Sequence, residues 1–286
     1  MAREAEESLV DRLLPWMRSF RNKVVLVTGA SSGIGKETAV AFGRQGARVA
    51  LAARRRELLR QVAADVTAAG GRALVVPVDV TDARAVRAAV GRVRRAWDRL
   101  DVLVNNAGVL IPDTVQELAV ADLEAMLRVN LYGALFMMQA ALPLMARQGR
   151  GTIINVASLG GRRGITPIGG YCATKFALVG LTEALRTEVD GRKIHVGLVM
   201  PGVVETPMVH DANQEAISAD WPEALNMPVS WVATAVLLAA RFRLREIAVP
   251  PGAATLEIIG SLAPGAMDAV IGWMRAAGRQ IRRMSE

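Results

Sequence analysis

The chain has 286 residues, of which 52% are hydrophobic and 22% are charged. This length and apolar content fit one large α/β domain or two small ones, and they exclude a disordered chain. The single cysteine, Cys172, excludes an internal disulfide framework and a cysteine-rich zinc site. The chain has two histidines, His195, expected at a strand edge, and His210, expected in a loop, so we predict no metal site.

The net charge is +8 and is carried largely by arginine. A basic chain can bind nucleic acid, an anionic membrane or an anionic cofactor. Because the arginines are spread over the predicted helices without interleaved aromatic residues, we expect no nucleic-acid partner. A general preference for arginine over lysine on solvated faces explains much of the surplus.

No stretch of the sequence approaches the roughly 20 apolar residues that span a bilayer. The longest strongly apolar stretch, Val232 to Ala240, is interpreted as a buried helix. Acidic residues near the N-terminus argue against an export signal. We therefore expect a cytoplasmic protein, and peripheral contact with a membrane surface stays open.

Apolar runs alternate with amphipathic segments along most of the chain. Strands are predicted at 23–28, 48–53, 73–78, 102–104, 152–156 and 196–200. Helices are predicted at 33–45, after the second strand, at 82–97, in a long segment ending near Met145, and from about Tyr171. This alternation predicts the α/β class, with one domain built on a doubly wound parallel sheet that helices cover on both faces.

Two terminal segments stand apart from this pattern. We expect a helical extension over residues 1–21, a main domain over 22–263, and an amphipathic helix over 264–286. Each terminal segment could lie on a membrane surface, pack on the domain or contact a partner subunit. We favour packing.

A glycine-rich turn, Thr28 to Gly35, connects the first strand to the first helix. A turn at this place must bend sharply, let a pyrophosphate approach the backbone, and aim a helix N-terminus at it. Glycine suits the first two needs because it has no Cβ. The turn therefore predicts dinucleotide binding.

Tyr171 and Lys175 are four residues apart and share one face of the predicted helix. A neighbouring cation favours the ionised form of a phenol, which makes Tyr171 a candidate general acid and base. The alternative is a half-buried ring beside a solvated lysine, and the other motifs decide between the two.

Together these motifs resemble the classical short-chain dehydrogenase/reductase family over about residues 22–210. The TGxxxGIG pattern matches Thr28 to Gly35, and the family's Asn-Asn-Ala-Gly matches residues 105–108. Its Pro-Gly matches Pro201-Gly202, with Thr206 following. Its catalytic Asn, Ser, Tyr and Lys match Asn130, Ser158, Tyr171 and Lys175.

The resemblance implies a Rossmann-type fold and a carbonyl/alcohol oxidoreductase that acts through hydride transfer, here expected as a reductase. Tyr171 would supply the proton, Ser158 would hydrogen-bond the substrate oxygen, and Lys175 would lower the Tyr171 pKa and hold the nicotinamide ribose. Asn130 would hold a water that joins Lys175 to solvent. A rival hypothesis is that the chain is a non-catalytic NADPH-binding sensor or regulatory protein, which could also be associated with a membrane surface.

The cofactor is predicted to be NADP(H). Enzymes that use NAD place an acidic residue at the end of the second strand, whereas Ala53 stands there and Arg54-Arg55 follow. Guanidinium groups suit a 2′-phosphate, so Arg54 is expected to be the main contact. The residues predicted to bind the cofactor are Gly29, Ser31, Ser32, Gly33, Ile34, Gly35, Arg54, Arg55, Asp79, Val80, Asn106, Ala107, Gly108, Tyr171, Lys175, Pro201, Gly202, Val204 and Thr206. A rival role for Asp79 is helix capping, for which Asp82 is better placed.

The substrate is expected to be lipophilic. A lid is predicted over Val203 to Met227, with Met208, Trp221, Leu225 and Met227 as pocket walls. The other pocket edge is predicted at Gly160 to Ile168, where Arg162 and Arg163 could instead favour an acidic group, and both readings stay open. The resemblance also implies a homodimer or homotetramer.

Overall fold

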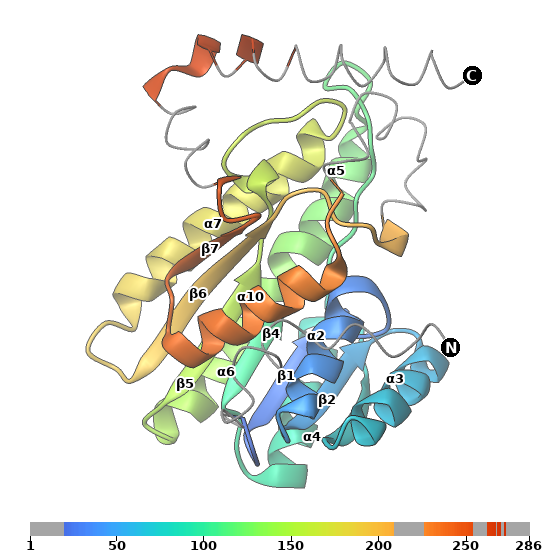
Figure 1. The fold of residues 1–286 in the computed structure, drawn as a ribbon, viewed down its shortest axis with the longest axis vertical. Helices are drawn as coiled ribbons and strands as arrows, with labels where there is room; N and C mark the ends of the chain where they lie inside the picture. The colour runs from blue at the N-terminus through green and yellow to red at the C-terminus, as the bar shows by residue number, and fades with distance from the viewer. Residues whose placement is uncertain (1–19, 209–225, 254–261, 267, 270–271, 273–286) are drawn as a thin grey trace.

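Short aliphatic runs form a parallel sheet in the computed structural model, which describes residues 20–208, 226–253, 262–266, 268–269 and 272. Within these residues the sheet has seven strands in the order β3-β2-β1-β4-β5-β6-β7 (Figure 1). The strands are β1 (Val24–Thr28), β2 (Arg48–Ala53), β3 (Arg72–Pro77), β4 (Val102–Asn105), β5 (Gly151–Val156), β6 (Ile194–Pro201) and β7 (Glu246–Val249). The predicted α/β class and doubly wound parallel sheet are confirmed.

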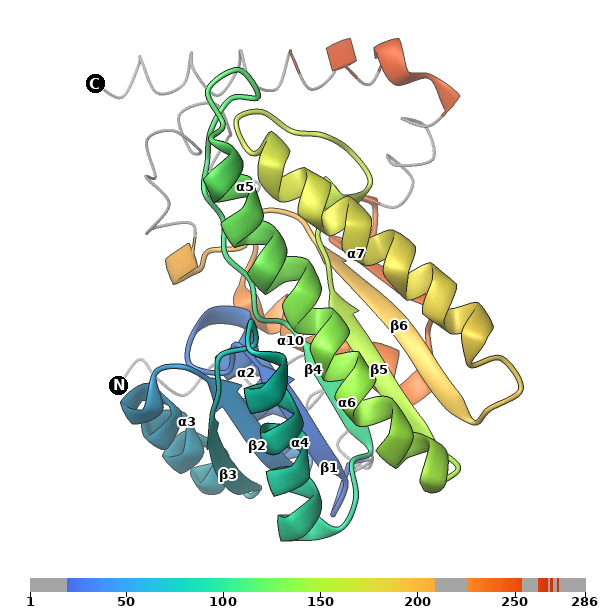
Figure 2. The same ribbon diagram turned by 180° about the vertical axis from the view of Figure 1, so that it is seen from behind.

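Helices cover both faces of the sheet. One face carries α2 (Gly33–Arg44), α3 (Arg56–Ala68) and α10 (Val229–Phe242), as Figure 1 shows. The other face, seen in Figure 2, carries α4 (Ala83–Trp97), α5 (Val120–Leu127), α6 (Gly133–Arg147) and α7 (Gly169–Glu188). A π-helix, η1 (Arg128–Tyr132), joins α5 to α6, and a 3₁₀ turn, η2 (Leu159–Gly161), follows β5.

The strand order reverses between β1 and β4, and this reversal determines where a site can form. Strand β1 continues to β2 on one side, while β4 pairs with β1 on the other. In open parallel sheets the loops at the carboxyl ends of such strands separate and leave a crevice between them. The glycine-rich turn after β1 and the loop after β4 both lie at this crevice.

Most predicted elements are found with small shifts in their bounds. Asp82 caps α4 as expected, since its carboxylate accepts hydrogen bonds from the Arg84 and Ala85 backbone N–H groups. The segment 232–240 is a buried part of α10, and His195 lies on β6 with its ring against the Leu244 carbonyl oxygen at 3.0 Å. His210 lies outside the described residues.

Two expectations about the elements are corrected. The sequence predicted six strands, but Glu246–Val249 forms a seventh, which pairs in parallel with β6. The sequence also predicted no segment long and apolar enough to span a bilayer, yet the continuous helical stretch Val120–Arg147 meets that criterion by length and composition. This stretch packs beside α4 and α7 over the sheet, which is the position of a core helix.

A buried polar network links the centre of the sheet to α7. The Asn105 amide donates to Asn155 Oδ1 at 2.8 Å, and the Asn155 amide donates to Thr182 Oγ1 at 2.8 Å. Asn155 and Thr182 have no solvent exposure. Buried polar groups of this kind stabilise a fold only while each has its partner.

We predict that Thr182→Val lowers the free energy of unfolding by about 2 kcal/mol, because the buried Asn155 amide loses its acceptor. The matched control is Thr187→Val on the same helix, where the hydroxyl is exposed and the expected change is within about 0.5 kcal/mol. Urea unfolding of the three proteins measures both changes. Equal losses in the two variants would contradict the assigned role of the network.

Candidate active site

The glycine-rich turn after β1 is shaped by close backbone contacts. Gly29 has a φ of +65°, and a Cβ there would lie 2.9 Å from the Ala107 Cα. A Cβ on Gly35 would lie 2.3 Å from the Gly29 carbonyl oxygen. Neither position can carry a side chain without moving the backbone, so both glycines predicted from the motif are required by the geometry.

Hydrogen bonds of Thr28 hold this turn against the loop after β4. Its hydroxyl accepts hydrogen bonds from the N–H groups of Asn106 and Ala107 at 2.9 and 3.0 Å, and donates to the Val104 carbonyl at 3.3 Å. The Asn106 amide returns a bond to the Thr28 carbonyl at 3.0 Å. No role for the Thr28 side chain was predicted from the sequence, although its place at the end of an apolar strand beside a glycine was the available signal.

The start of α2 faces the loop that follows β6. Ser32 is the N-cap residue of α2, and its side chain makes no capping hydrogen bond. A Cβ on Gly33 would lie 3.4 Å from Thr206 Cγ2, so Thr206, which is buried, lies next to the helix start. The first N–H groups of a helix carry partial positive charge and, where no side chain caps them, can bind an anion.

Arg55, rather than Arg54, reaches the glycine-rich turn. Its guanidinium donates to Ser31 Oγ at 3.0 Å and to Ser32 Oγ at 2.9 Å. Arg54 is exposed just beyond the end of β2. A guanidinium and two hydroxyls therefore meet where β2 ends, next to Ala53.

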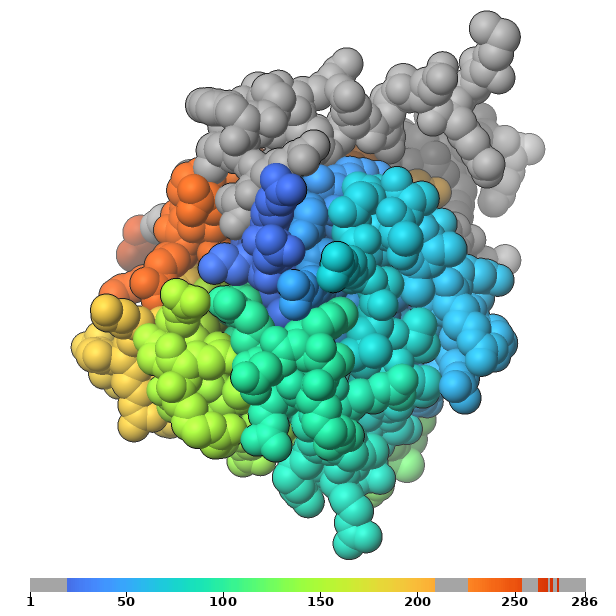
Figure 3. All heavy atoms as spheres, turned by 90° about the horizontal axis from the view of Figure 1, so that it is seen from below, coloured from blue at the N-terminus to red at the C-terminus, as the bar shows by residue number. Residues whose placement is uncertain are grey.

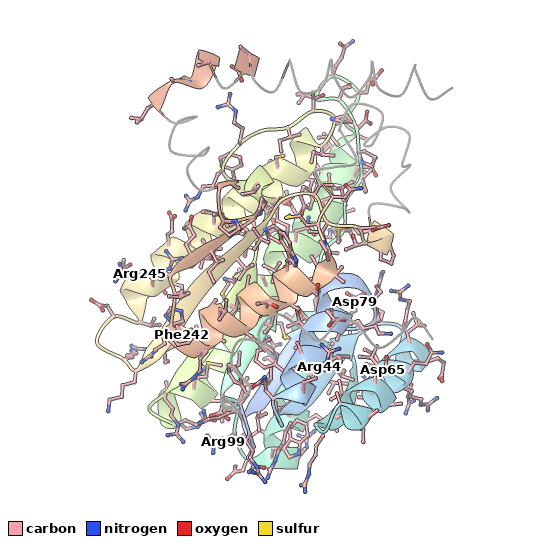
Figure 4. All side chains as sticks on the ribbon, viewed as in Figure 1. Arg44, Asp65, Asp79, Arg99, Phe242 and Arg245 are labelled. Atoms are coloured by element: carbon pink, nitrogen blue, oxygen red, sulfur yellow. The ribbon has the colours of Figure 1, made fainter. Side chains whose placement is uncertain are left out.

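Asp79 and Val80 follow β3 at the same edge of the sheet. The Asp79 carboxylate accepts hydrogen bonds from the Thr81 N–H at 2.9 Å and the Thr81 hydroxyl at 2.8 Å. Val80 is buried against Gly133, where a Cβ would lie 2.7 Å from Val80 Cγ2. In Figure 4, Asp79 and Arg99 mark opposite edges of the sheet: Asp79 follows the carboxyl end of β3, and Arg99 precedes the amino end of β4.

Ser158 and Tyr171 meet beyond the carboxyl end of β5. The Ser158 side chain is hydrogen-bonded to the Tyr171 phenol. Ser158 Oγ also lies 3.3 Å from the Pro201 carbonyl and accepts from the Gly160 N–H at 3.1 Å. Burial raises the pKa of the Tyr171 phenol, and the bond to Ser158 offsets only part of this.

Lys175 lies one turn along α7 from Tyr171 and is buried. Its Nζ donates to the Val156 carbonyl at 3.0 Å and lies 5.5 Å from the centre of the Tyr171 ring. Burial lowers the pKa of Lys175 to about 8. The sequence predicts that Lys175 lowers the Tyr171 pKa, whereas in this structure desolvation by burial is the largest effect and the Tyr171 pKa is raised.

Asn130 lies in the π-helix and holds the loop after β4. Its Oδ1 accepts from the Val109 N–H at 2.8 Å, and its amide donates to the Val109 carbonyl and to Thr174 Oγ1, each at 2.9 Å. The role expected of Asn130, to hold a water that joins Lys175 to solvent, stays a prediction. Single turns of π-helix are frequent at functional sites, and no sequence pattern predicted this one.

The remaining predicted residues surround this centre. Gly108 faces Asn130, with a would-be Cβ 3.3 Å from Asn130 Oδ1 and 3.6 Å from Met208 Cε. The Gly202 N–H donates to the Val249 carbonyl at 2.8 Å, and Val204 forms an isolated bridge with Met227. Trp221 and Leu225, predicted as pocket walls, lie outside the described residues.

The two arginines predicted at the pocket edge bind other parts of the chain. Arg162 pairs with Glu183 on α7 at 2.8 Å and with Glu246 on β7 at 2.9 Å. Arg163 pairs with Asp268 and donates to the Pro264 carbonyl at 3.2 Å. Arg162 is therefore neutralised by two carboxylates and offers little attraction to an acidic substrate.

The arrangement can transfer a proton at one place and hold an anion at another. Tyr171, Ser158 and Lys175 form the first group, and the turn after β1 with Arg55 forms the second. The two lie along the same edge of the sheet, joined by the loop after β4. Such a pairing suits a reaction that combines proton transfer with a phosphate-bearing cofactor.

Comparisons with known proteins agree with this arrangement. A model of the short chain dehydrogenase family matches residues 23–217. Ketoacyl reductase HetN of Nostoc sp. is 32% identical over 264 residues, which cover 90% of this chain and 91% of that protein. Sorbitol dehydrogenase of Cereibacter sphaeroides is 36% identical over 207 residues, which cover 72% of this chain and 78% of that protein.

Solved structures show the same fold. A short-chain type dehydrogenase/reductase from Mycobacterium marinum has a TM-score of 0.77 at 30% identity, with 83% of this chain and 97% of that chain covered. A short chain dehydrogenase/reductase from Burkholderia phymatum, in complex with NAD, has a TM-score of 0.74 at 27% identity, with 82% and 92% covered. The chain therefore belongs to the short-chain dehydrogenase family of oxidoreductases.

Proposed function

We propose that this chain is an NADP(H)-dependent oxidoreductase that interconverts a carbonyl and an alcohol, and that it acts mainly as a reductase. The observation that carries the proposal is the contact of Tyr171 with Ser158 beside the buried Lys175, at the same sheet edge as the glycine-rich turn. The family relatives include both a ketoacyl reductase and several dehydrogenases, which supports the reaction class.

The residues at this edge fit a nicotinamide dinucleotide. Gly29 and Gly35 leave a backbone cradle that a Cβ would fill, and the uncapped start of α2 suits a pyrophosphate. Lys175 and Thr206 would hold the nicotinamide half, and Asp79 the adenine half. When bound, the cofactor supplies the hydride.

The preference for NADP(H) rests on the end of β2. Ala53 stands where an NAD-dependent enzyme has a carboxylate, so nothing there repels a 2′-phosphate. Arg55, with Ser31 and Ser32, forms a cluster of donors beside it. We infer that Arg55 is the main phosphate ligand, with Arg54 as a second cation at the surface.

The side chains of the site support a proton-donating role. A raised pKa keeps the Tyr171 phenol neutral, and a neutral phenol is the form that gives a proton to a carbonyl oxygen. Ser158 would donate a hydrogen bond to the same oxygen. Lys175, with a pKa near 8, can return a proton toward Tyr171 at close to neutral pH.

A lipophilic substrate remains our proposal. Met208 lies over Gly108, and the would-be Cβ of Gly202 lies within 3.4 Å of Leu159 and Met227 side-chain carbons, so the residues that approach the site from this side are apolar. Arg162 is already paired, which disfavours an acidic substrate. The name of the ketoacyl reductase HetN, whose substrate carries an acyl chain, is consistent with this.

We also propose that the protein is a cytoplasmic homo-oligomer, with peripheral membrane contact as the alternative. Two pairs of large apolar side chains are partly exposed on helices. Tyr132 and Phe176 are each 44% exposed on the face of η1 and α7, and Trp231 and Phe242 are 51% and 50% exposed on α10. Such groups suit contact between subunits.

We predict that Tyr171→Phe lowers kcat for NADPH-dependent carbonyl reduction by at least ~10²-fold, because the proton donor is removed. The affinity for NADPH should change by less than about 3-fold. Tyr132→Phe is the matched control, since Tyr132 is the other tyrosine of the chain and is partly exposed. If Tyr171→Phe retains near-normal turnover, the catalytic assignment is wrong; if the wild-type chain binds NADPH but turns over no carbonyl in a broad panel, the non-catalytic sensor gains support.

We predict that Arg55→Gln lowers kcat/KM for NADPH by roughly 10- to 100-fold and leaves the value for NADH within about 3-fold, because charge-assisted hydrogen bonds to phosphate are lost. Arg54→Gln removes the same charge one residue away and should have the smaller effect. Steady-state kinetics with both cofactors measures this. A larger effect of Arg54→Gln would identify Arg54 as the main contact of the 2′-phosphate. If neither substitution changes kcat/KM for NADPH, the result counts against a preference for NADP(H).

We predict that kcat/KM for NADPH falls as the pH rises through about 8. Burial depresses the Lys175 pKa, so the ammonium form that holds the site is present below this pH and is lost above it. This parameter reports groups of the free enzyme. In Lys175→Arg the residual activity should lack the decline, because a guanidinium stays charged; the same decline in that variant would assign it to another group.

A further inference from the structure

A hollow lined by four arginines lies at the edge of the sheet opposite to the site described above. Its walls are Arg21, Arg44, Arg48 and Arg72, with Asn22, Gly46, Ala69 and Gly70 between them, and its volume is about 230 Å³. These residues precede β1, begin β2 and β3, or lie at the ends of the helices before β2 and β3. Six-residue strands separate this hollow from the glycine-rich turn, a distance of roughly 20 Å.

Two of these arginines lie side by side on neighbouring strands. Arg48 begins β2, Arg72 begins β3, and the two are direct partners in the parallel register. Residues paired in this way project to the same face at strand spacing, about 4.8 Å apart. Like charges placed directly opposite each other destabilise a sheet, and an anion between them would remove this repulsion.

Ion pairs among the described residues compensate only one of the four arginines of the hollow. Glu37 pairs with Arg44 at 3.0 Å. In the part of the chain that the structure describes, no carboxylate pairs with Arg21, Arg48 or Arg72. Arg48 Nε is also buried there without a hydrogen-bond partner, and such a donor on a cationic group is costly to leave unpaired.

Helix ends account for part of the positive charge. Helices α2 and α3 end here, and each C-terminus carries about half a negative charge. Together with Glu37 they offset about two of the four guanidinium charges, so roughly two positive charges remain. A phosphoryl group at neutral pH carries about −1.5 to −2. The remaining charge of the hollow thus matches one such group.

The size of the hollow restricts the ligand further. A volume of about 230 Å³ is the space of about seven or eight water molecules. It is below the roughly 300 Å³ at which sites for drug-sized ligands begin, so a whole dinucleotide does not fit. Phosphate and diphosphate groups are small enough, and the fork of a guanidinium matches their oxygen atoms.

We propose that this hollow is a second anion-binding site, which takes a phosphate or diphosphate group at the edge of the sheet away from the catalytic residues. In this arrangement Arg48 and Arg72 hold the anion from the strands, while Arg21 and Arg44 hold it from the chain before β1 and the end of α2. Figure 3 views the molecule from this lower end, where the dark blue start of the described chain adjoins the lighter blue and cyan surface.

The test is titration calorimetry of the full chain with inorganic pyrophosphate and inorganic phosphate. Arg72→Gln should weaken pyrophosphate binding at least 10-fold, and Arg48→Gln should do the same. Arg72 is exposed, so its replacement should not disturb folding. The Arg72→Gln variant therefore decides the outcome if Arg48→Gln does not fold. Two controls remove the same charge elsewhere, Arg87→Gln and Arg92→Gln, both on the exposed side of α4.

The expected result is a loss confined to Arg72→Gln and Arg48→Gln, with less than 3-fold change in both controls. Equal losses in all four variants would mean that only net charge matters and would overturn the site, as would no binding at millimolar pyrophosphate. A second arm, co-sedimentation with vesicles that contain phosphatidic acid or only phosphatidylcholine, identifies the source. Sedimentation with phosphatidic acid that Arg72→Gln abolishes supports a lipid headgroup, and retained pyrophosphate binding without sedimentation supports a soluble phosphate compound.

Discussion

The hydroxyl of Thr28 is the contact on which the rest of the site depends. It fixes the loop after β4 to the end of β1 through the N–H groups of Asn106 and Ala107. The same loop is held farther along by Asn130, whose amide binds Val109 and Thr174. Thr174 in turn donates to the Tyr171 carbonyl at 2.8 Å. A path of hydrogen bonds and short backbone segments therefore links the glycine-rich turn to the helix that carries Tyr171 and Lys175, and it holds the two at a set distance.

Burial acts in opposite directions on the two titratable groups of α7. It raises the pKa of Tyr171 and lowers that of Lys175, so it favours the neutral form of both. A neutral phenol beside a lysine that titrates near pH 8 is suited to donating a proton and receiving one back. The site thus begins in the protonation state that carbonyl reduction needs. Alcohol oxidation would require the phenolate, which this environment disfavours until other charges enter the site.

The sequence alone predicted the sheet, the helices on both faces and the grouping of the motif residues, because buried parallel strands and glycine turns have strong local patterns. It missed β7 because four residues, of which only Ala248 and Val249 are buried, give a weak pattern. It preferred Arg54 over Arg55 because the direction of a long exposed side chain is not encoded in its position. The pairing of Arg162 with Glu183 and Glu246 depends on contacts up to 84 residues apart, which no local pattern reports. The raised pKa of Tyr171 is likewise beyond local patterns, because it depends on burial of the phenol by the whole fold.

The π-helix at residues 128–132 makes the geometry of the site depend on the number of residues in this segment. A π turn holds one more residue than an α turn, so the residues on its two sides are offset by about 100° from a regular helix. Asn130 lies inside this turn and faces Val109 and Thr174, while Gly133 directly after it faces Val80. Removing one residue here would restore a regular helix and rotate everything before it relative to everything after it. The number of residues in this segment, and not only their identity, therefore determines whether the two halves of the site face each other.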